Sequence, residues 1–278
     1  MDIGVFLSNG SFGDQSWAFC QIDDLCKYFN EESVTVHTFR NDFYCHGEND
    51  YHVLSTSPDV LKLWSMNKQI KTICFHDAID EKFKKAKKNH GWFCFLLSKG
   101  FSPYDYHYIK KNLIFTKNYP KITNKPLAVF QPISLAKKPK DKLDSYIQPW
   151  NKTIETTLNK GFDIAVIGTE CQRKDFCKVF HHDLSKHMID LVGKTSLVEA
   201  LDIVLNQSSL VISCCSWSGV FAISSRIPTC ISVGYKIANN IDGYLMPYLG
   251  NKDVYIQQNA STKELADDNF SKWIEEIF

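Results

Sequence analysis

Short apolar runs alternate with segments of helical periodicity along the first half of the chain. Apolar runs at residues 3–7, 34–39, 51–55 and 70–76 predict strands, and residues 113–116 form another short apolar run. Helices are expected between them, at residues 15–29 and 58–67. Strands that alternate with helices are typical of βαβ units, so the pattern favours a parallel sheet with helices against its faces.

The same alternation returns in the second half. Apolar runs predict strands at residues 163–168, 210–213 and 229–233. A helix is expected at residues 150–160, because Gly161 stands where a helix commonly ends. The second half therefore has an α/β pattern of its own.

Shorter helices are expected between these strands, at residues 171–180, 196–205 and 219–225. Thr195 is the expected N-cap of the second of them. The last segment, residues 263–277, has the apolar spacing of an amphipathic helix.

A seam separates the two halves. Residues 117–149 hold five of the nine prolines together with many lysines, which is the composition of a boundary between domains. We therefore expect two Rossmann-like α/β domains, at residues 1–125 and 126–278. The C-terminal segment 263–278 is expected to return to the first domain.

Composition narrows the class of protein. Hydrophobic residues make up 44% of the chain and charged residues 23%, as in ordinary globular proteins. The sequence holds neither an apolar run of transmembrane length nor a basic signal-peptide start, and its ten cysteines form no C-x-x-C pair. We expect no membrane span and a cytoplasmic location, which for a viral protein means the host cytoplasm.

Charge is unevenly distributed, although the net charge is only +1. Residues 82–142 hold 15 lysines against two aspartates, Asp105 and Asp141. Such a block is either a solvated lysine-rich face or a surface that meets a polyanion through many lysines at once. The sequence leaves both interpretations open.

Three segments follow predicted strands, and in open parallel sheets ligands bind beyond the carboxyl ends of the strands. Residues 10–14 contain glycines that admit a close ligand, and Asp14 would stand at a helix start, where it is equally suited to be an N-cap. Residues 193–196 read Gly-Lys-Thr-Ser like the end of a P-loop, but no glycine stands five positions earlier. Residues 213–219 offer hydroxyls and helix N–H groups suited to a pyrophosphate, or to an ordinary helix cap.

Taken together, these segments resemble the heptosyltransferase-type glycosyltransferases of family 9, which have GT-B architecture. The clearest match runs over residues 190–201, with the Gly-Lys-Thr-Ser-Leu segment, and continues through 209–213 to 227–229. Residues 130–134, with a lysine loop after them, are similar to the first strand of the family's second domain. Gly13-Asp14 matches the family's Gly-Asp, whose aspartate is the proposed catalytic base.

The chain departs from the family in one turn. Cys214-Cys215-Ser216-Trp217 stands where the family usually has Asn-Asp-Thr/Ser-Gly, and Val220 occupies its histidine position. The acid of that turn is therefore missing, and we expect a UDP-sugar as donor in place of ADP-heptose.

The resemblance implies two Rossmann-like domains with parallel sheets that face a central cleft, and a C-terminal helix that packs back on the N-terminal domain. It implies a metal-independent, inverting transfer of a sugar from a nucleotide-diphosphate sugar to an acceptor hydroxyl. The first domain would bind the acceptor and the second the donor. No cofactor and no metal are expected.

The resemblance also assigns residues to roles. Asp14 would be the catalytic base. Donor-binding residues would be Lys137, Lys138, Lys140, Gly168, Thr169, Glu170, Ile189, Asp190, Leu191, Lys194, Thr195, Ser216, Ser218 and Gly219. Acceptor-binding residues would be Ser11, Phe12, Gly13, Gln15, Lys84, Lys85 and Lys88.

The acceptor is the least constrained part of the prediction. The lysine block and a composition rich in Lys, Asn, Ile, Phe and Tyr favour a hydroxymethylated pyrimidine base in double-stranded phage DNA. Such an enzyme must extrude the base from the duplex. A lipopolysaccharide or other surface saccharide is the alternative acceptor, and a non-catalytic nucleotide-sugar binder is the alternative from another functional class.

Overall fold

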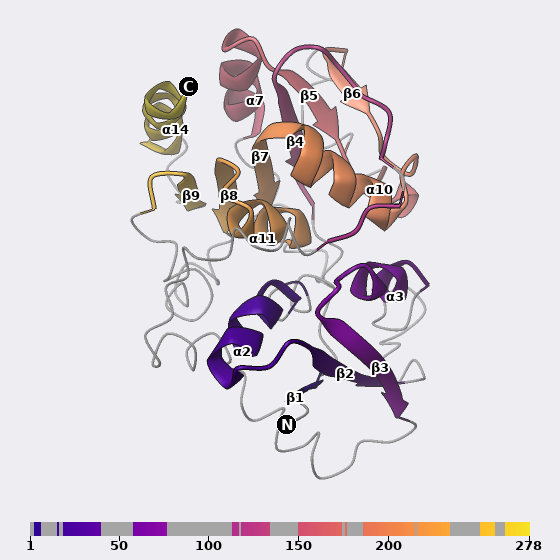
Figure 1. The fold of residues 1–278 in the computed structure, drawn as a ribbon. Helices are drawn as coiled ribbons and strands as arrows, with labels where there is room; N and C mark the ends of the chain where they lie inside the picture. The colour runs from indigo at the N-terminus through magenta and orange to yellow at the C-terminus, as the bar shows by residue number, and fades with distance from the viewer. Residues whose placement is uncertain are drawn as a thin grey trace, which may run out of the picture. The chain divides into compact units, whose positions relative to one another are not determined.

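The computed structural model divides the chain into two compact units, Met1–Lys117 and Asn118–Phe278 (Figure 1). The division falls between 117 and 118, whereas the sequence placed it between 125 and 126. The structure describes residues 3–6, 16, 19–39, 58–76, 113–116, 118–133, 150–173, 176, 186–214, 216–233, 251–258 and 265–278.

Unit 1 contains a parallel three-stranded sheet in the order β1-β2-β3. The strands are β1 (Ile3–Phe6), β2 (Val34–Phe39) and β3 (Ile70–His76), close to three of the strands that the apolar runs predict. The strand expected at 51–55 lies outside the described residues. Helices α2 (Ile22–Phe29) and α3 (Pro58–Ser65) stand between them in the chain. Each strand pair is therefore joined through a helical connection, as the alternation predicts.

The core of unit 1 is built from the apolar faces of these elements. Ile22 and Leu25 on α2 are buried, as is Val36 on β2. The rings of Phe19 and Trp64 meet edge to face, with their centroids 4.8 Å apart. The same periodicity that predicts α2 and α3 thus buries their apolar sides.

Unit 2 contains a six-stranded sheet in which all strands are parallel, in the order β6-β5-β4-β7-β8-β9. From β4 the chain adds strands outward on one side, then returns to the other side at β7. This is the strand order of the doubly wound Rossmann fold, with its topological switch point between β4 and β7. The strands are β4 (Leu127–Gln131), β5 (Asp163–Val166), β6 (Met188–Asp190), β7 (Ser208–Cys214), β8 (Thr229–Val233) and β9 (Val254–Gln258).

Helices cover both faces of this sheet. One face packs against α7 (Trp150–Asn159) and α14 (Leu265–Ile277). The other carries α10 (Leu197–Asp202), its π-helical continuation η4 (Ile203–Gln207) and α11 (Trp217–Ser224). Of the expected helix at 171–180, the structure describes residues 171–173 and 176. The short 3-10 helix η3 (Glu170–Gln172) begins the segment, Arg173 and Phe176 are α-helical, and the rest lies outside the described residues.

Helix α14 packs against α7 and β9 of its own unit. Its residues Phe270, Trp273 and Ile274 are buried in the core cluster of unit 2. The indole Nε1 of Trp273 donates a hydrogen bond of 2.8 Å to the carbonyl of Lys252, just before β9. The apolar stripe of the helix therefore finds its partner surface on the second sheet.

The segment 118–126 belongs to unit 2, because side chains of α10 and η4 accept hydrogen bonds from its backbone. The N–H of Tyr119 donates to Asp202 Oδ2 at 2.6 Å, and the N–H of Ile122 donates to Gln207 Oε1 at 3.1 Å. These bonds run from the end of α10 and from η4 to the chain that enters β4. They explain why the unit begins before the expected boundary.

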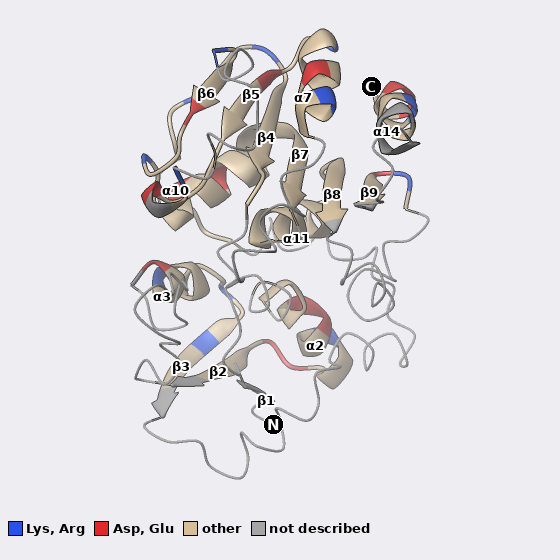
Figure 2. Ribbon diagram, turned by 180° about the vertical axis from the view of Figure 1, so that it is seen from behind, with Lys and Arg blue, Asp and Glu red and all other residues tan. Residues whose placement is uncertain are grey.

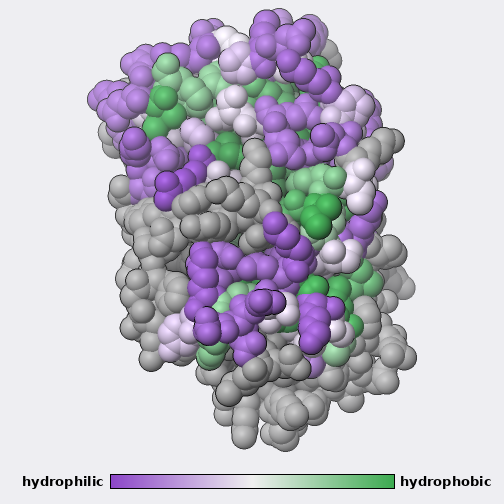
Figure 3. Space-filling view, viewed as in Figure 1, coloured by the Kyte–Doolittle hydropathy of each residue, from purple (hydrophilic) through white to green (hydrophobic). Residues whose placement is uncertain are grey.

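Basic and acidic residues are interspersed along the ribbon (Figure 2). On the face drawn in Figure 3, the described residues are mainly hydrophilic, with smaller apolar areas between them. Of the lysine-rich block at 82–142, the structure describes only residues 113–116 and 118–133. Within the described ranges, no helix combines the length and the apolar character that crossing a membrane requires.

We predict that Phe270→Ala lowers the free energy of unfolding by about 3–5 kcal/mol, because it opens a cavity in the core of unit 2. The measurement is urea unfolding of the full chain. Lys272→Ala is the control, since that residue is exposed on the same helix. Equal effects of the two substitutions would contradict the packing of α14 on this sheet.

Candidate functional site

The segments that the sequence assigns to a donor site meet at the carboxyl edge of the sheet of unit 2. They follow β5, β6 and β7, and all strands of this sheet run in the same direction. The described residues placed there are Gly168, Thr169, Glu170, Ile189, Asp190, Leu191, Lys194, Thr195, Ser216, Ser218 and Gly219. Ligands of doubly wound sheets bind at this edge.

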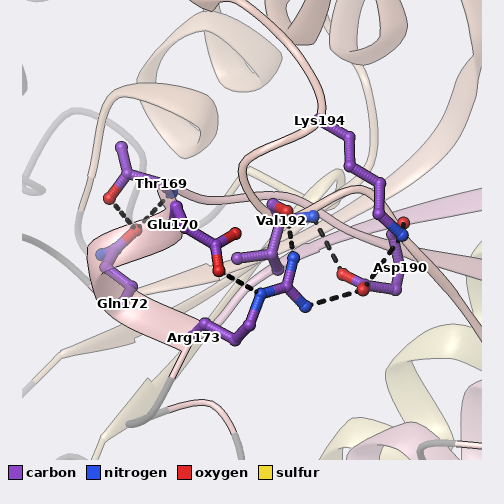
Figure 4. A network of polar contacts seen from close by, with 7 residues as sticks. All are labelled: Thr169, Glu170, Gln172, Arg173, Asp190, Val192 and Lys194. Atoms are coloured by element: carbon purple, nitrogen blue, oxygen red, sulfur yellow. Dashed lines mark hydrogen bonds and ion pairs between the residues drawn. The ribbon is translucent and has the colours of Figure 1, made fainter.

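Arg173 joins the turn after β5 to the turn after β6 (Figure 4). Its Nε donates to Glu170 Oε1 at 2.7 Å, and its Nη1 lies 2.8 Å from Asp190 Oδ2. The remaining terminal nitrogen donates to the carbonyl of Val192 at 2.5 Å. One guanidinium therefore holds two carboxylates and one backbone carbonyl in a fixed arrangement.

Asp190 is held from three sides. Besides Arg173, the N–H of Val192 donates to its Oδ1 at 3.0 Å, and Lys194 Nζ lies 3.1 Å from its Oδ2. Burial acts to raise the pKa of Asp190, but the hydrogen bonds from Arg173, Val192 and Lys194 outweigh it and hold the pKa below its ordinary value. Hydrogen bonds to Glu170 and Asp190 in turn raise the pKa of Arg173. Asp190 and Arg173 are thus both charged at neutral pH.

Gly193 lets these turns approach each other, and Gly168 lets the ring of Phe176 pack against the turn after β5. The N–H of Gly193 donates to the carbonyl of Gly168 at 2.8 Å, and Gly193 adopts a φ of +68°. A Cβ at Gly193 would overlap the carboxylate of Glu170 and lie 2.9 Å from its Cβ. A Cβ at Gly168 would lie 2.7 Å from the ring of Phe176. Both positions require glycine because of close neighbours.

The turn after β5 is also tied to the chain after β4. The N–H of Thr169 donates to Gln172 Oε1 at 2.9 Å, and Gln172 Nε2 donates to the carbonyl of Ile133 at 3.0 Å. The ends of three neighbouring strands, β4, β5 and β6, are therefore linked through side chains of η3 and the residue after it.

The segment after β6 leads directly into α10. Ser196 is the N-cap of this helix, and its Oγ accepts the N–H of Glu199 at 3.3 Å. Glu199 Oε2 accepts the N–H of Ser196 at 2.8 Å in return, which completes a capping box. This corrects the sequence expectation that Thr195 caps the helix. Thr195 stands one residue earlier and is half-buried.

The start of α11 divides its predicted ligand residues into two kinds. Ser216 is the N-cap residue, yet its hydroxyl does not cap the helix. Ser218 is fully buried, and its Oγ lies 2.9 Å from Ser213 Oγ. A Cβ at Gly219 would lie 3.2 Å from Ile231. The Ser218 hydroxyl and the bare Cα of Gly219 thus pack α11 against the sheet. Only the backbone N–H groups of these two residues face the helix start.

The remaining predicted residues lie outside the part of the chain that the structure describes. They are the catalytic candidate Asp14, the donor candidates Lys137, Lys138 and Lys140, and the acceptor candidates Ser11, Phe12, Gly13, Gln15, Lys84, Lys85 and Lys88.

Sequence reasoning missed Arg173 and Gln131. Arg173 stands three residues after Glu170, a spacing at which opposite charges meet in a helical turn, so this ion pair was available from the sequence. Gln131 is the last residue of β4, at the switch point, and only its burial in the fold makes it notable.

A cavity of about 480 Å³ lies at the opposite, amino edge of the same sheet. It is lined by the segment that enters β4 and by Asp202, Asn206 and Gln207. None of its lining residues belongs to the carboxyl-edge site.

No protein-family model matches the sequence, and no curated protein matches it. Among solved structures, the ADP-heptose LPS heptosyltransferase II of Escherichia coli shares 10% identity at a TM-score of 0.54, over 100% of this chain and 98% of that one. A family 9 glycosyl transferase from Veillonella parvula shares 11% identity at 0.55, over 99% and 96%. The E. coli heptosyltransferase WaaC with ADP shares 12% at 0.54, over 100% of both chains. The chain therefore has the α/β GT-B fold of these proteins, as its sequence predicts.

We predict that Gly193→Ala costs more stability than Gly161→Ala. Both glycines have positive φ, but a Cβ at Gly161 meets nothing within 4 Å, whereas at Gly193 it meets Glu170. Gly161→Ala should cost about 1–2 kcal/mol for the backbone alone, and Gly193→Ala about 1–3 kcal/mol more. Urea unfolding of both variants measures this difference, and equal losses would refute the close approach of the two turns.

We predict that the stabilisation from Asp190 disappears in acid. Because the folded pKa lies below the ordinary 3.8, this contribution is present above about pH 4 and is lost as the pH falls through the lowered value. The stability difference between the wild type and Asp190→Asn should be largest near neutral pH and shrink below pH 4. Thermal unfolding across pH 2.5–7 measures it, and a difference independent of pH would contradict the network.

Proposed function

We propose that this protein is a glycosyltransferase that moves a sugar from a nucleoside-diphosphate sugar to an acceptor hydroxyl with inversion and without a metal. One observation carries the proposal. Donor-site candidates from three separate segments converge at the switch-point edge of a Rossmann-order sheet, in a chain whose fold matches heptosyltransferases from end to end.

The pyrophosphate would lie at the start of α11. The N–H groups of Ser218 and Gly219 stand in the first turn, where they have no partner within the helix, and the helix dipole favours an anion there. The hydroxyl of Ser216 would add a further donor, since it does not cap the helix. The resemblance to family 9 adds one or more lysines that follow β4 in the sequence, namely Lys137, Lys138 and Lys140.

The ribose would meet Glu170. Arg173 takes one carboxylate oxygen of Glu170, and the side chain is 67% exposed, so the other oxygen can accept ribose hydroxyls. The backbone of Leu191 is already committed, because its N–H donates to Val166 and its carbonyl accepts from Lys194. Recognition of the base at this strand end would therefore depend on side chains more than on the backbone of Leu191.

The reaction would be a single displacement. Asp14 takes the proton of the acceptor hydroxyl while that oxygen attacks the anomeric carbon. The bond from the anomeric carbon to the diphosphate breaks on the opposite side, which inverts the configuration. Positive groups at the start of α11 and on the lysine loop stabilise the charge of the leaving diphosphate.

A saccharide is the acceptor that we now favour. Two of the structural relatives are heptosyltransferases, and one is described as acting on lipopolysaccharide. The phage DNA base depends on the lysine block, most of which lies beyond the described residues. A non-catalytic nucleotide-sugar binder would bind the donor and transfer nothing.

We predict that Asp14→Asn lowers the transfer rate by about 10²–10⁴-fold and leaves donor affinity unchanged, because the base acts only on the acceptor. The measurement is mass spectrometry of saccharide and hydroxymethylated DNA acceptors after incubation with UDP-, ADP- and GDP-sugars. Asp59→Asn, an exposed position on α3, is the matched control.

The acceptors separate the alternatives. Product on saccharides supports the favoured acceptor, and salt-sensitive product on DNA supports the other. Donor binding without product on any acceptor favours the binder. Full activity of Asp14→Asn would refute the proposed base.

A further inference from the structure

Gln131 places an unpaired oxygen inside the carboxyl-edge site. It is the last residue of β4 and is 5% exposed, so its side chain is more than nine-tenths buried. Its Oε1 has no hydrogen-bond partner in the described part of the chain. Buried polar atoms are almost always paired, so this exception calls for a partner from outside.

The strand register directs this side chain toward the start of α11. Gln131 pairs with Ser213 of β7 across the switch point, and paired residues of neighbouring parallel strands project from the same face of the sheet. On that face, Ser213 Oγ lies 2.9 Å from Ser218 Oγ in the first turn of α11. On the other side of Gln131 lies Ile167, just after β5, which is buried and whose apolar side chain has no hydrogen-bond donor.

The neighbouring hydroxyls cannot satisfy this oxygen. The hydroxyl of Ser213 donates its hydrogen to the carbonyl of Cys214 at 2.6 Å. The hydrogen in the contact between the two serines must therefore come from Ser218. Both hydroxyl hydrogens are used, and Gln131 Oε1 is left as an acceptor beside the helix start.

We propose that Gln131 Oε1 accepts a hydrogen bond from a hydroxyl of the sugar that the donor carries. This inference rests on the proposed function. Phosphate oxygens are acceptors and repel another acceptor, so the diphosphate cannot satisfy the amide oxygen. Ribose and base would lie toward Glu170 and Asp190, at the ends of β5 and β6. The sugar beyond the diphosphate is the part of the donor that brings hydroxyl hydrogens to the switch point.

Gln131→Met tests this inference, because methionine keeps the length of the side chain and removes its amide. Two effects are expected together. The unliganded variant keeps or gains thermal stability, since a buried unpaired acceptor is removed. Its affinity for the nucleotide sugar falls about tenfold, while its affinity for the nucleoside diphosphate stays within about twofold.

Calorimetry with the pairs UDP and UDP-glucose, and ADP and ADP-glucose, measures both affinities on the full chain. Gln257→Met is the matched control, because this glutamine lies on β9 of the same sheet, is 1% exposed and has an unpaired Nε2. Its side chain meets Cys230, which belongs to the core cluster on the α7 side. The control should leave the ratio of the two affinities unchanged.

Two results would overturn the inference. One is an unchanged ratio of the two affinities, which includes an equal loss for both members of a pair, and it requires that the wild type binds at least one pair. The other is a lower stability of the unliganded variant. A wild type that binds neither member of either pair contradicts the proposed function itself, and the inference with it.

Discussion

The hydrogen bond from the N–H of Gly193 to the carbonyl of Gly168 brings two backbone turns into direct contact at the carboxyl edge of the second sheet. A Cβ at Gly193 would meet Glu170 in the other turn and keep the turns apart. With the turns in contact, Arg173 reaches Glu170 and Asp190 at the same time. The backbone contact therefore sets the distance between the charged side chains at the ends of β5 and β6. Electrostatic attraction then holds these side chains together.

The edge has two parts with different chemistry. At β5 and β6, the carboxylates and cations satisfy one another, which fixes the site before any ligand arrives. At β4 and β7, the helix start and Gln131 keep unused hydrogen-bonding capacity. The ends of β5 and β6 thus form a rigid part that orients one end of a ligand. The start of α11 and Gln131 form a second part, whose hydrogen bonds are completed only by the other end of the ligand.

The sequence predicts the strands with the strongest apolar runs, such as β5, β7 and β8, because central strands are buried on both faces. It misses β6 and β9, the two edge strands of the sheet, because half-exposed edges carry a weaker pattern. The pattern also misses central strand β4, which lies among the prolines of the expected seam and is indicated only by the family resemblance, at 130–134. It predicts α14 from its apolar stripe, but a stripe does not specify the surface that covers it. Likewise, Ser218 and Gly219 were assigned to a ligand from their position, and only the fold reveals that they pack against Ser213 and Ile231.

The strand order also bears on how the chain is made. Central strand β4 is synthesised before every other strand of its sheet, and β5 and β6 can join it on one side as they leave the ribosome. Its opposite edge meets β7 only much later in translation. During that interval a hydrophobic strand in the middle of the future core has a row of unpaired backbone groups, the kind of edge through which nascent chains aggregate. Slow elongation, or a chaperone, would protect this edge until β7 has been made.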